Sequence, residues 1–309
     1  MPSFAAPAQA GRPRSFTFFQ RYDMIFSQDR LQKNVIGVIF GGKHISAARI
    51  ENGTIAAIVQ NEINNWGEEE QILSDMIHAI CSVYTDSVEG IGIGVPSLVD
   101  VKEGIVLNPT NIPSWHKVYL KDILEERFGV PVFINNDANC FALGEKYFGV
   151  AKDYENIAGI TIGTGFGVGI IINGKLYSGR NAGAGEFCSI PYRDYDYEYY
   201  CSGKYFEQKY GLKSDILLSR ARNSDKIALA IYELFGVDLG NAIKTIIYVL
   251  DPDAIVIGGR LAEAYEFFKE SMLKTVKSFI YKDSLKHLKI LHSTESHISI
   301  YGAAALCFE

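Results

Sequence analysis

The middle of the chain alternates between helical and strand patterns of apolar residues. From Glu68 to Tyr84 apolar residues recur every three or four positions, which predicts an amphipathic helix. Gly90–Pro96 and Pro131–Ile134 are short apolar runs typical of buried strands, and Leu120–Phe128 between them has helical spacing. Helices that alternate with strands in this way predict an α/β fold with mainly parallel strands.

The same alternation continues to the C-terminus. Asp238–Leu250 is a strongly apolar stretch that predicts a helix ending at an Asp-Pro pair, and a buried strand is predicted at Ala254–Gly259. Leu261–Ile280 has the spacing of a long amphipathic helix. We expect the last strand and helix within residues 297–309.

Two regions of the chain, residues 35–60 and 157–179, share one pattern. Each reads as strand, glycine-rich turn, strand, Asn-Gly turn and strand. The Asn-Gly pairs are Asn52-Gly53 and Asn173-Gly174. Such a pair between apolar runs predicts a tight hairpin, because both central residues adopt positive φ. The pattern indicates an internal duplication, with one copy in each of two lobes.

The length of 309 residues also exceeds what one hydrophobic core usually holds. We expect an N-terminal extension over residues 1–33, an N-terminal α/β lobe over 34–145 and a C-terminal α/β lobe over 146–309. The last helix is expected to pack back on the N-terminal lobe.

The glycine-rich turns allow two interpretations. Glycines let a backbone approach a phosphate closely, and successive N–H groups can bind an anion. The alternative is a pair of plain hairpins loosened by glycine. Two copies favour a nucleotide cleft between the lobes, with one turn from each. This arrangement resembles the two-lobed actin-like ATPase and sugar kinase fold, a ribonuclease H-like duplication.

One polar triplet follows a predicted strand directly. Val132–Glu145 runs from an apolar segment into Asn135, Asn136 and Asp137 and then into a helical pattern. Ligands in open α/β folds bind beyond the carboxyl ends of the strands, so Asp137 is placed to accept a proton from a bound hydroxyl. The alternative is that the triplet turns the chain and caps the next helix.

Composition narrows the classes of partner. The net charge of −6 and the isoelectric point near 5.6 give no overall attraction to nucleic acid. No apolar run approaches the ~20 residues that span a bilayer, and the N-terminus lacks the pattern of a secretory signal. Five scattered cysteines are typical of free thiols in a reducing compartment. We expect a cytoplasmic protein without membrane or nucleic-acid partners.

Six motifs resemble the ROK family (repressor, open reading frame, kinase) of bacterial sugar kinases and sugar-responsive regulators, over residues 35–309. The motifs are GIGIGVPSLVD at 90–100, NPTNIPSW at 108–115, INNDANCFALGE at 134–145, TIGTGFGVGI at 161–170, AGAGE at 182–186 and LDPDAIVIGG at 250–259. They occur in the family's order and spacing.

The resemblance implies a cleft in which a hexose or amino-sugar hydroxyl receives the γ-phosphoryl group of ATP, with Mg²⁺. Asp137 matches the family's catalytic base. Asn136, Glu186 and Glu207 match its sugar ligands, with Glu207 placed less firmly because the sequence before it has diverged. The nucleotide-side matches are Gly41, Gly42, Gly163, Thr164, Gly165, Gly258 and Gly259. The resemblance also implies a homodimer.

The chain departs from the family at its first glycine-rich turn. Ile39 occupies the position of an acidic residue that helps to organise Mg²⁺, and isoleucine offers the cation no oxygen ligand. Lys43 stands where a small hydroxyl residue belongs. Lys43 could clash with the phosphates or replace part of the metal's charge, or the turn could bind nothing.

The family's zinc site is also lost from the sequence. Ser189 replaces a histidine, and Cys188 with Cys201 cannot supply a full set of zinc ligands, so we expect no structural zinc. Tyrosines crowd the same region, between Tyr192 and Tyr205. They could stack on a sugar, but packing of a loop or a subunit interface is favoured.

Three functions are consistent with these features. The leading prediction is an ATP-dependent sugar kinase with Asp137 as general base. The alternative is a sugar- or nucleotide-binding regulatory protein derived from a kinase, which the residues Ile39, Lys43 and Ser189 favour. A DNA-binding repressor would need a reader domain that residues 1–33 are too short to provide. Fold alone does not separate these functions.

Overall fold

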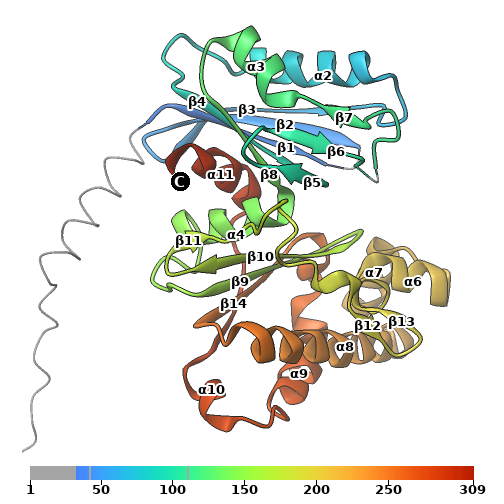
Figure 1. Cartoon of the computed structure of the whole chain (residues 1–309). Helices are drawn as coiled ribbons and strands as arrows, with labels where there is room; N and C mark the ends of the chain where they lie inside the picture. The colour runs from blue at the N-terminus through green and yellow to red at the C-terminus, as the bar shows by residue number, and fades with distance from the viewer. Residues whose placement is uncertain (1–32, 42, 110) are drawn as a thin grey trace, which may run out of the picture.

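Two five-stranded sheets, stacked with helices between and outside them, form the molecule (Figure 1). The structure is a computed structural model that describes residues 33–41, 43–109 and 111–309. Nearly all of the predicted N-terminal extension therefore lies outside the described residues, as does Gly42.

The first sheet has the strand order β3-β2-β1-β4-β8. Its strands are β1 (Val35–Phe40), β2 (His44–Glu51), β3 (Thr54–Glu62), β4 (Gly90–Val95) and β8 (Val132–Asn136). The first three strands are antiparallel neighbours, whereas β1, β4 and β8 run parallel. Helices α2 (Glu69–Cys81) and α3 (Leu120–Phe128) cover the outer face (Figure 1).

The second sheet repeats this order as β11-β10-β9-β14-β15. Its strands are β9 (Ile157–Ile162), β10 (Phe166–Ile172), β11 (Lys175–Leu176), β14 (Ala254–Gly258) and β15 (Lys289–His292). Helices α8 (Lys226–Leu250) and α9 (Tyr265–Val276) pack against each other below it (Figure 1). Both Asn-Gly turns have positive φ at both residues, as predicted. The internal duplication is thus present in the strand order itself.

Two helices, α4 (Asp137–Tyr147) and α11 (Ile298–Ala305), cross between the sheets. Helix α4 contacts β9 and β10 of the second sheet, while α11 contacts β1 and β4 of the first. The last helix therefore does return to the N-terminal lobe. At the crossing, a Cβ on Gly302 would lie 1.6 Å from the Cys140 carbonyl oxygen, so only glycine allows this approach of the two backbones.

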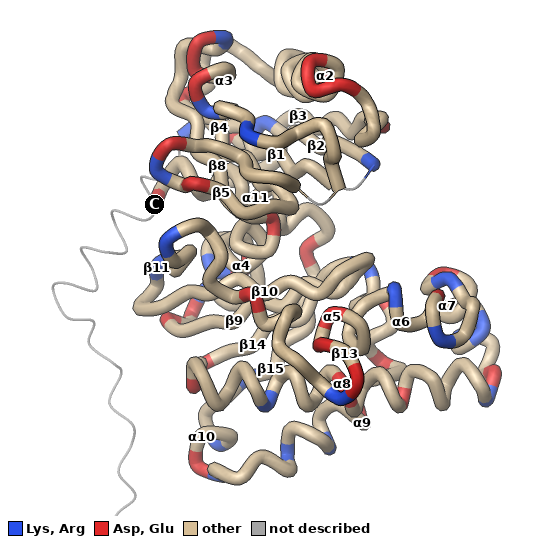
Figure 2. The backbone as a smooth tube through the Cα atoms, turned by 45° about the vertical axis from the view of Figure 1, so that its right-hand side comes forward, with Lys and Arg blue, Asp and Glu red and all other residues tan. Residues whose placement is uncertain are grey.

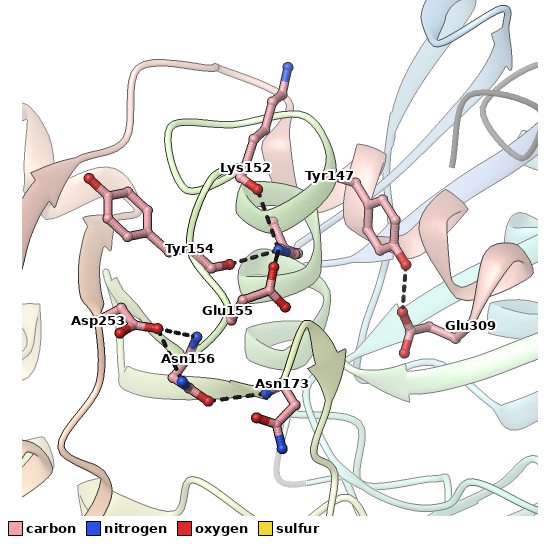
Figure 3. A network of polar contacts seen from close by, with 9 residues as sticks. Tyr147, Lys152, Tyr154, Glu155, Asn156, Asn173, Asp253 and Glu309 are labelled. Atoms are coloured by element: carbon pink, nitrogen blue, oxygen red, sulfur yellow. Dashed lines mark hydrogen bonds and ion pairs between the residues drawn. The ribbon is translucent and has the colours of Figure 1, made fainter. Parts of the chain in front are cut away.

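Polar contacts tie the far end of α4 to the second lobe (Figure 3). Lys146 Nζ donates to the Tyr154 carbonyl at 2.7 Å and pairs with Glu155 at 3.2 Å. The Tyr147 hydroxyl donates to Glu309 Oε1 at 3.0 Å, close to the C-terminus of the chain. These contacts attach the last residues of α4 to the segment that follows the helix and to the C-terminal residue Glu309.

Several predicted boundaries differ from the structure. Helix α8 begins at Lys226, well before Asp238, because Asp225 caps it and accepts hydrogen bonds from the Ile227 and Ala228 N–H groups. The predicted helix over Leu261–Ile280 is a 3₁₀ turn followed by α9. The last strand is β15, which ends before residue 297, so residues 297–309 hold helical structure only.

Short elements complete the fold. The first lobe adds a small sheet of β5 (Leu98–Asp100), β6 (Ile105–Leu107) and β7 (Lys117–Val118). The second lobe adds η1 (Phe187–Ser189), β12 (Pro191–Tyr192), β13 (Tyr195–Asp196), α5 (Tyr197–Tyr200), α6 (Gly203–Tyr210), α7 (Ser214–Arg222), η2 (Arg260–Ala264), α10 (Lys282–His287) and η3 (Leu306–Phe308). Within the described residues, no helix has the length and apolar character of a membrane span.

Candidate functional site

Asp137 is the first residue of α4, where β8 passes directly into the helix. Asn136 is the N-cap: its Oδ1 accepts a hydrogen bond from the Ala138 N–H at 2.9 Å. The Asn136 amide also donates to the Ser97 carbonyl at 3.3 Å. The capping interpretation therefore holds for Asn136. Asp137 lies beyond the cap, at the positive end of the helix dipole, which favours a carboxylate.

Asn135 anchors this junction from below. It is only 2% exposed, and its Oδ1 accepts hydrogen bonds from the Asn136 N–H and the Asn139 amide. Its Nδ2 donates to Ser178 Oγ at 3.0 Å, which belongs to the second lobe. Because every contact is a hydrogen bond between buried or half-buried groups, the backbone at Asp137 is held rigidly.

The environment of Asp137 is largely apolar on one side. If Gly94 carried a Cβ, that atom would lie 2.6 Å from Ile39 Cδ1, 2.9 Å from Cys140 Sγ and 3.4 Å from Asp137 Cα. The side chains of Ile39 and Cys140 and the backbone of Asp137 therefore all pack around Gly94. Burial raises the pKa of Asp137 to about 6. Backbone N–H groups of Ala138 and Asp137 oppose the rise, and the nearby charge of Glu186 adds to it.

Glu186 reaches the site on a loop that contacts both lobes, residues 177–186. The Ala184 N–H donates to the Ser178 carbonyl within the loop, and the Val99 N–H of the first lobe donates to the Asn181 carbonyl at 3.3 Å. Ala182, buried with positive φ, packs into the core of the first lobe. The loop therefore delivers Glu186 from the second lobe to a position close enough to act on Asp137.

Glu198 lies near the same place, although the sequence analysis missed it. The Cys188 thiol donates to Glu186 Oε2 at 3.2 Å. Burial raises the pKa of that thiol to about 11, with further contributions from the charges of Glu186 and Glu198. Glu198 lies in the helical turn α5, which the side chain of Asp196 caps. An aspartate in that position is a sequence signal for the start of a helix.

Glu207 is placed differently. It lies in the last turns of α6 with an exposed side chain, and its carbonyl accepts the capping hydrogen bond from the Gly211 N–H. By contrast, Glu198 Oε2 would lie 3.3 Å from a Cβ on Gly165, and Glu198 Oε1 pairs with Lys204 Nζ at 2.5 Å. Glu198 thus faces the second glycine-rich turn.

The glycine-rich turns are tight. The Gly41 N–H donates to the His44 carbonyl at 2.8 Å, and Lys43 is exposed. In the second turn the Gly163 N–H donates to the Gly165 carbonyl at 2.9 Å, which leaves Thr164 exposed at the tip. A Cβ on Gly163 would meet no atom within 4 Å, so this turn borders open space.

Gly258 ends β14 and Gly259 follows it; the next residue, Arg260, lines a small hollow of about 80 Å³. Gly258 packs on the Phe141 ring, 2.5 Å from where its Cβ would be, which accounts for that glycine by packing. The hollow is lined by Ser214, Asp215, Leu218, Tyr232, Arg260, Leu261, Glu263 and Ala264. The buried Tyr232 hydroxyl has no hydrogen-bond partner among the described residues.

The diverged zinc region is filled by aromatic side chains. Tyr192 stacks on Tyr197 with ring centroids 4.6 Å apart, and Tyr195 stacks on Tyr199 at 4.1 Å. Ser189 is exposed and Cys201 is fully buried. In the part of the chain that the structure describes, no three His, Cys, Asp or Glu residues are grouped so as to hold a metal ion.

Acidic and basic residues both occur throughout the described chain. In the view of Figure 2, blue and red segments are interspersed over both lobes of the described chain. A larger hollow of about 470 Å³ lies between loop 177–187 and the end of α8, and its lining includes neither Asp137 nor Glu186.

Comparison with known proteins agrees with this architecture. The family model described as the ROK family matches residues 35–309. The chain is 31% identical over 281 residues to the xylose repressor of Bacillus subtilis, covering 84% of this chain and 72% of the repressor. It is 29% identical over 309 residues to the glucokinase of Thermotoga maritima, covering 89% of this chain and 97% of the glucokinase.

A solved structure is similar over the whole fold. A ROK family glucokinase from Streptomyces griseus, in complex with glucose and AMPPNP, has a TM-score of 0.77 and 27% identity, covering 88% of this chain and 98% of that one. The predicted two-lobed actin-like ATPase fold is confirmed. The relatives of this chain thus include both a glucokinase and a xylose repressor. With the motifs, the duplicated sheets and the matched family model together, this chain belongs to the ROK family.

Proposed function

We propose that this protein transfers the γ-phosphoryl group of ATP to a hydroxyl of a hexose or an amino sugar, with Asp137 as general base. The observation that carries the proposal is the half-buried Asp137 at the start of α4, with its pKa raised to about 6 and a second carboxylate nearby. A base with such a pKa is ionised in about nine molecules of ten at pH 7 and still accepts a proton readily.

For the sugar side we propose Asn136, Glu186 and Glu198, with Glu198 in place of Glu207. The charges of Glu186 and Glu198 both raise the pKa of the Cys188 thiol, which itself donates to Glu186, and this supports assigning the two carboxylates to one side of the site. Carboxylates accept hydrogen bonds from hydroxyl groups, and several of them fix the orientation of a sugar ring. Asn136 contributes through the amide that also holds the Ser97 carbonyl.

For the nucleotide side we propose the Gly163-Thr164-Gly165 turn for the phosphates and the hollow beside Gly259 for the adenosine. The open space at Gly163 and the unpartnered Tyr232 hydroxyl fit this assignment. We also propose that the nucleotide lies beside Gly41, Gly42 and Gly258. Gly42 is outside the described residues.

The residues present do not fit a protein-organised Mg²⁺ ion at the first turn. Ile39 Cδ1 fills the space beside Asp137 where an oxygen ligand from β1 would be needed. We therefore assign no step to the metal. Asp137 takes the proton from the sugar hydroxyl as the sugar oxygen bonds to the γ-phosphorus. The bond from that phosphorus to the bridging oxygen breaks and ADP leaves with its electron pair, so Asp137 and the sugar ligands act chiefly by positioning.

The test is ADP release, measured with a coupled assay across glucose, xylose and N-acetylglucosamine. We expect turnover with at least one sugar and a loss of 10²-fold or more, as an order of magnitude, for Asp137→Asn. Asp153→Asn, an exposed aspartate on a turn, is the matched control and should keep full activity. Equal turnover of Asp137→Asn and wild type would refute Asp137 as the base.

A second function, sugar binding without phosphoryl transfer, is favoured by Ile39. An apolar side chain beside the base removes a ligand for the metal while leaving the carboxylates of the sugar side in place. This candidate predicts no ADP release with any sugar, together with a rise in melting temperature when one of them is added. Sugar-stimulated ADP release by the wild type would exclude it.

A further inference from the structure

The segment between Glu186 and Glu198 has few regular elements of its own. It consists of η1, the two-residue strands β12 and β13, and the first turn of α5. Pairing between β12 and β13 involves only Pro191 with Asp196 and Tyr192 with Tyr195. So short a hairpin is not stable alone, and both carboxylates depend on contacts with the rest of the lobe.

Those contacts converge on one face of α8. Asp238 is 1% exposed, and its Oδ1 pairs with Arg193 Nη2 at 2.7 Å. The same oxygen accepts a hydrogen bond from the Tyr192 hydroxyl at 3.0 Å. Asn241, one helical turn further along, donates from its amide to the Tyr192 hydroxyl at 3.0 Å.

The aromatic rings complete the attachment. The Tyr197 hydroxyl shares a hydrogen bond of 2.8 Å with Thr245 Oγ1, again one turn along α8. The Arg193 guanidinium lies over the rings of Tyr192 and Tyr200, 5.1 and 5.4 Å from their centroids. Arg193 has a positive φ of 52°, a strained position for this residue type that only surrounding contacts maintain.

We propose that Arg193 and Asp238, with Tyr192, form a metal-free clamp that positions Glu186 and Glu198 for the sugar. This inference rests on the proposed sugar site. The clamp occupies the region in which the family resemblance implies a zinc cluster, and among the described residues the donor set for a metal is missing there. Arg193 and Asp238 are positioning residues, because neither is placed against the sugar.

The test compares Arg193→Gln with wild type. Arg193 lies on the surface with its side chain 47% exposed, so its loss should leave the fold intact. We expect the sugar KM to rise about tenfold or more while kcat and the KM for ATP stay unchanged. Arg193→Lys, which keeps a cation beside Asp238, should recover part of the loss. Glu155→Gln, which removes the exposed half of the Lys146 pair, is the matched control.

Hydrogen–deuterium exchange measures how firmly the clamp holds the backbone, and it needs no bound sugar. Arg193→Gln should increase exchange over residues 187–205 and leave α9 unchanged. Unchanged exchange together with an unchanged sugar KM would overturn the clamp. So would a wild type that loses sugar affinity on prolonged EDTA treatment and regains that affinity when zinc is added. If calorimetry shows that the wild type binds no sugar of the panel, the proposed function is refuted instead. Hydrogen–deuterium exchange over residues 187–205 then decides whether the clamp holds that segment.

Discussion

Asp137 and Asn136 are neighbours with different roles. The Asn136 side chain accepts the hydrogen bond that starts α4 and donates one to the Ser97 carbonyl, whereas Asp137 has one face toward Ile39 and Cys140. Burial disfavours the charged form of a carboxyl group, and this is the main reason for its raised pKa. A carboxyl group buried in this way costs the folded state some stability when it is ionised.

The linkage between this pKa and stability has a definite sign. The pKa of Asp137 rises from 3.8 to about 6 on folding, so the folded protein binds the proton more tightly than the unfolded chain. The favourable contribution of the protonated Asp137 to the free energy of unfolding is present at pH 4 and is lost as the pH rises through about 6. Asp137→Asn cannot titrate, so its melting temperature relative to wild type should be higher at pH 8 than at pH 4.5.

Scanning calorimetry at the two pH values checks this prediction, with Asp153→Asn as control. Asp153 is exposed, and its substitution should not change the difference between the two pH values. A relative melting temperature of Asp137→Asn that does not vary with pH would contradict the raised pKa.

At the scale of elements, the crossing of α4 and α11 is the tightest contact between the lobes. A Cβ on Gly144 would lie 2.1 Å from the Ile298 carbonyl oxygen, and one on Gly302 would lie 1.6 Å from that of Cys140. The obstacles are backbone atoms of helices, which cannot turn aside as a side chain could. The crossing therefore fixes how closely α4 and α11 pack, and the α4 that it holds begins at Asp137.

Gly302→Ala should lower the free energy of unfolding by about 3 kcal/mol or more, because the added methyl group forces the two helices apart. Urea denaturation followed by circular dichroism measures the change. Gly163→Ala is the matched control, since its methyl group meets no atom within 4 Å and should leave stability unchanged. Equal stabilities of the two variants would show that the crossing tolerates a side chain.

At the scale of the whole molecule, the two lobes share one core. Besides a core within each lobe, a third cluster combines residues from the first sheet, α4, the second sheet and α11, among them Val35, Leu143, Ile157 and Ala304. Neither lobe can unfold without exposing this shared cluster. Burial of apolar surface is the main favourable term in folding, so the lobes should unfold together.

We therefore expect a single thermal transition in scanning calorimetry, with equal calorimetric and van't Hoff enthalpies. A bound sugar should move that transition upward as one peak, because it contacts residues of both lobes under the proposed function. Two resolved transitions in the free protein would contradict the shared core.

The sequence by itself determined the local and repeated features of this protein. The α/β class, the two Asn-Gly hairpins and the repeated pattern of strands and turns follow from spacing and turn chemistry, which act between residues close in sequence. The motifs at 134–145 and 182–186, together with four others, identified the family. The start of α8 was placed too late, at Asp238, although the residue directly before the helix, Asp225, caps it.

Only the tertiary structure decided which distant groups meet. It brought the charges of Glu186 and Glu198 to bear on Cys188, accounted for Gly258 by its packing on Phe141, and joined Arg193 to Asp238 across 45 positions of the chain. The local pattern around each of these residues is compatible with an ordinary surface helix or turn. Their roles come from contacts that form when α8 and the short hairpin of β12 and β13 pack together, and such non-local contacts leave no periodic signal in the sequence.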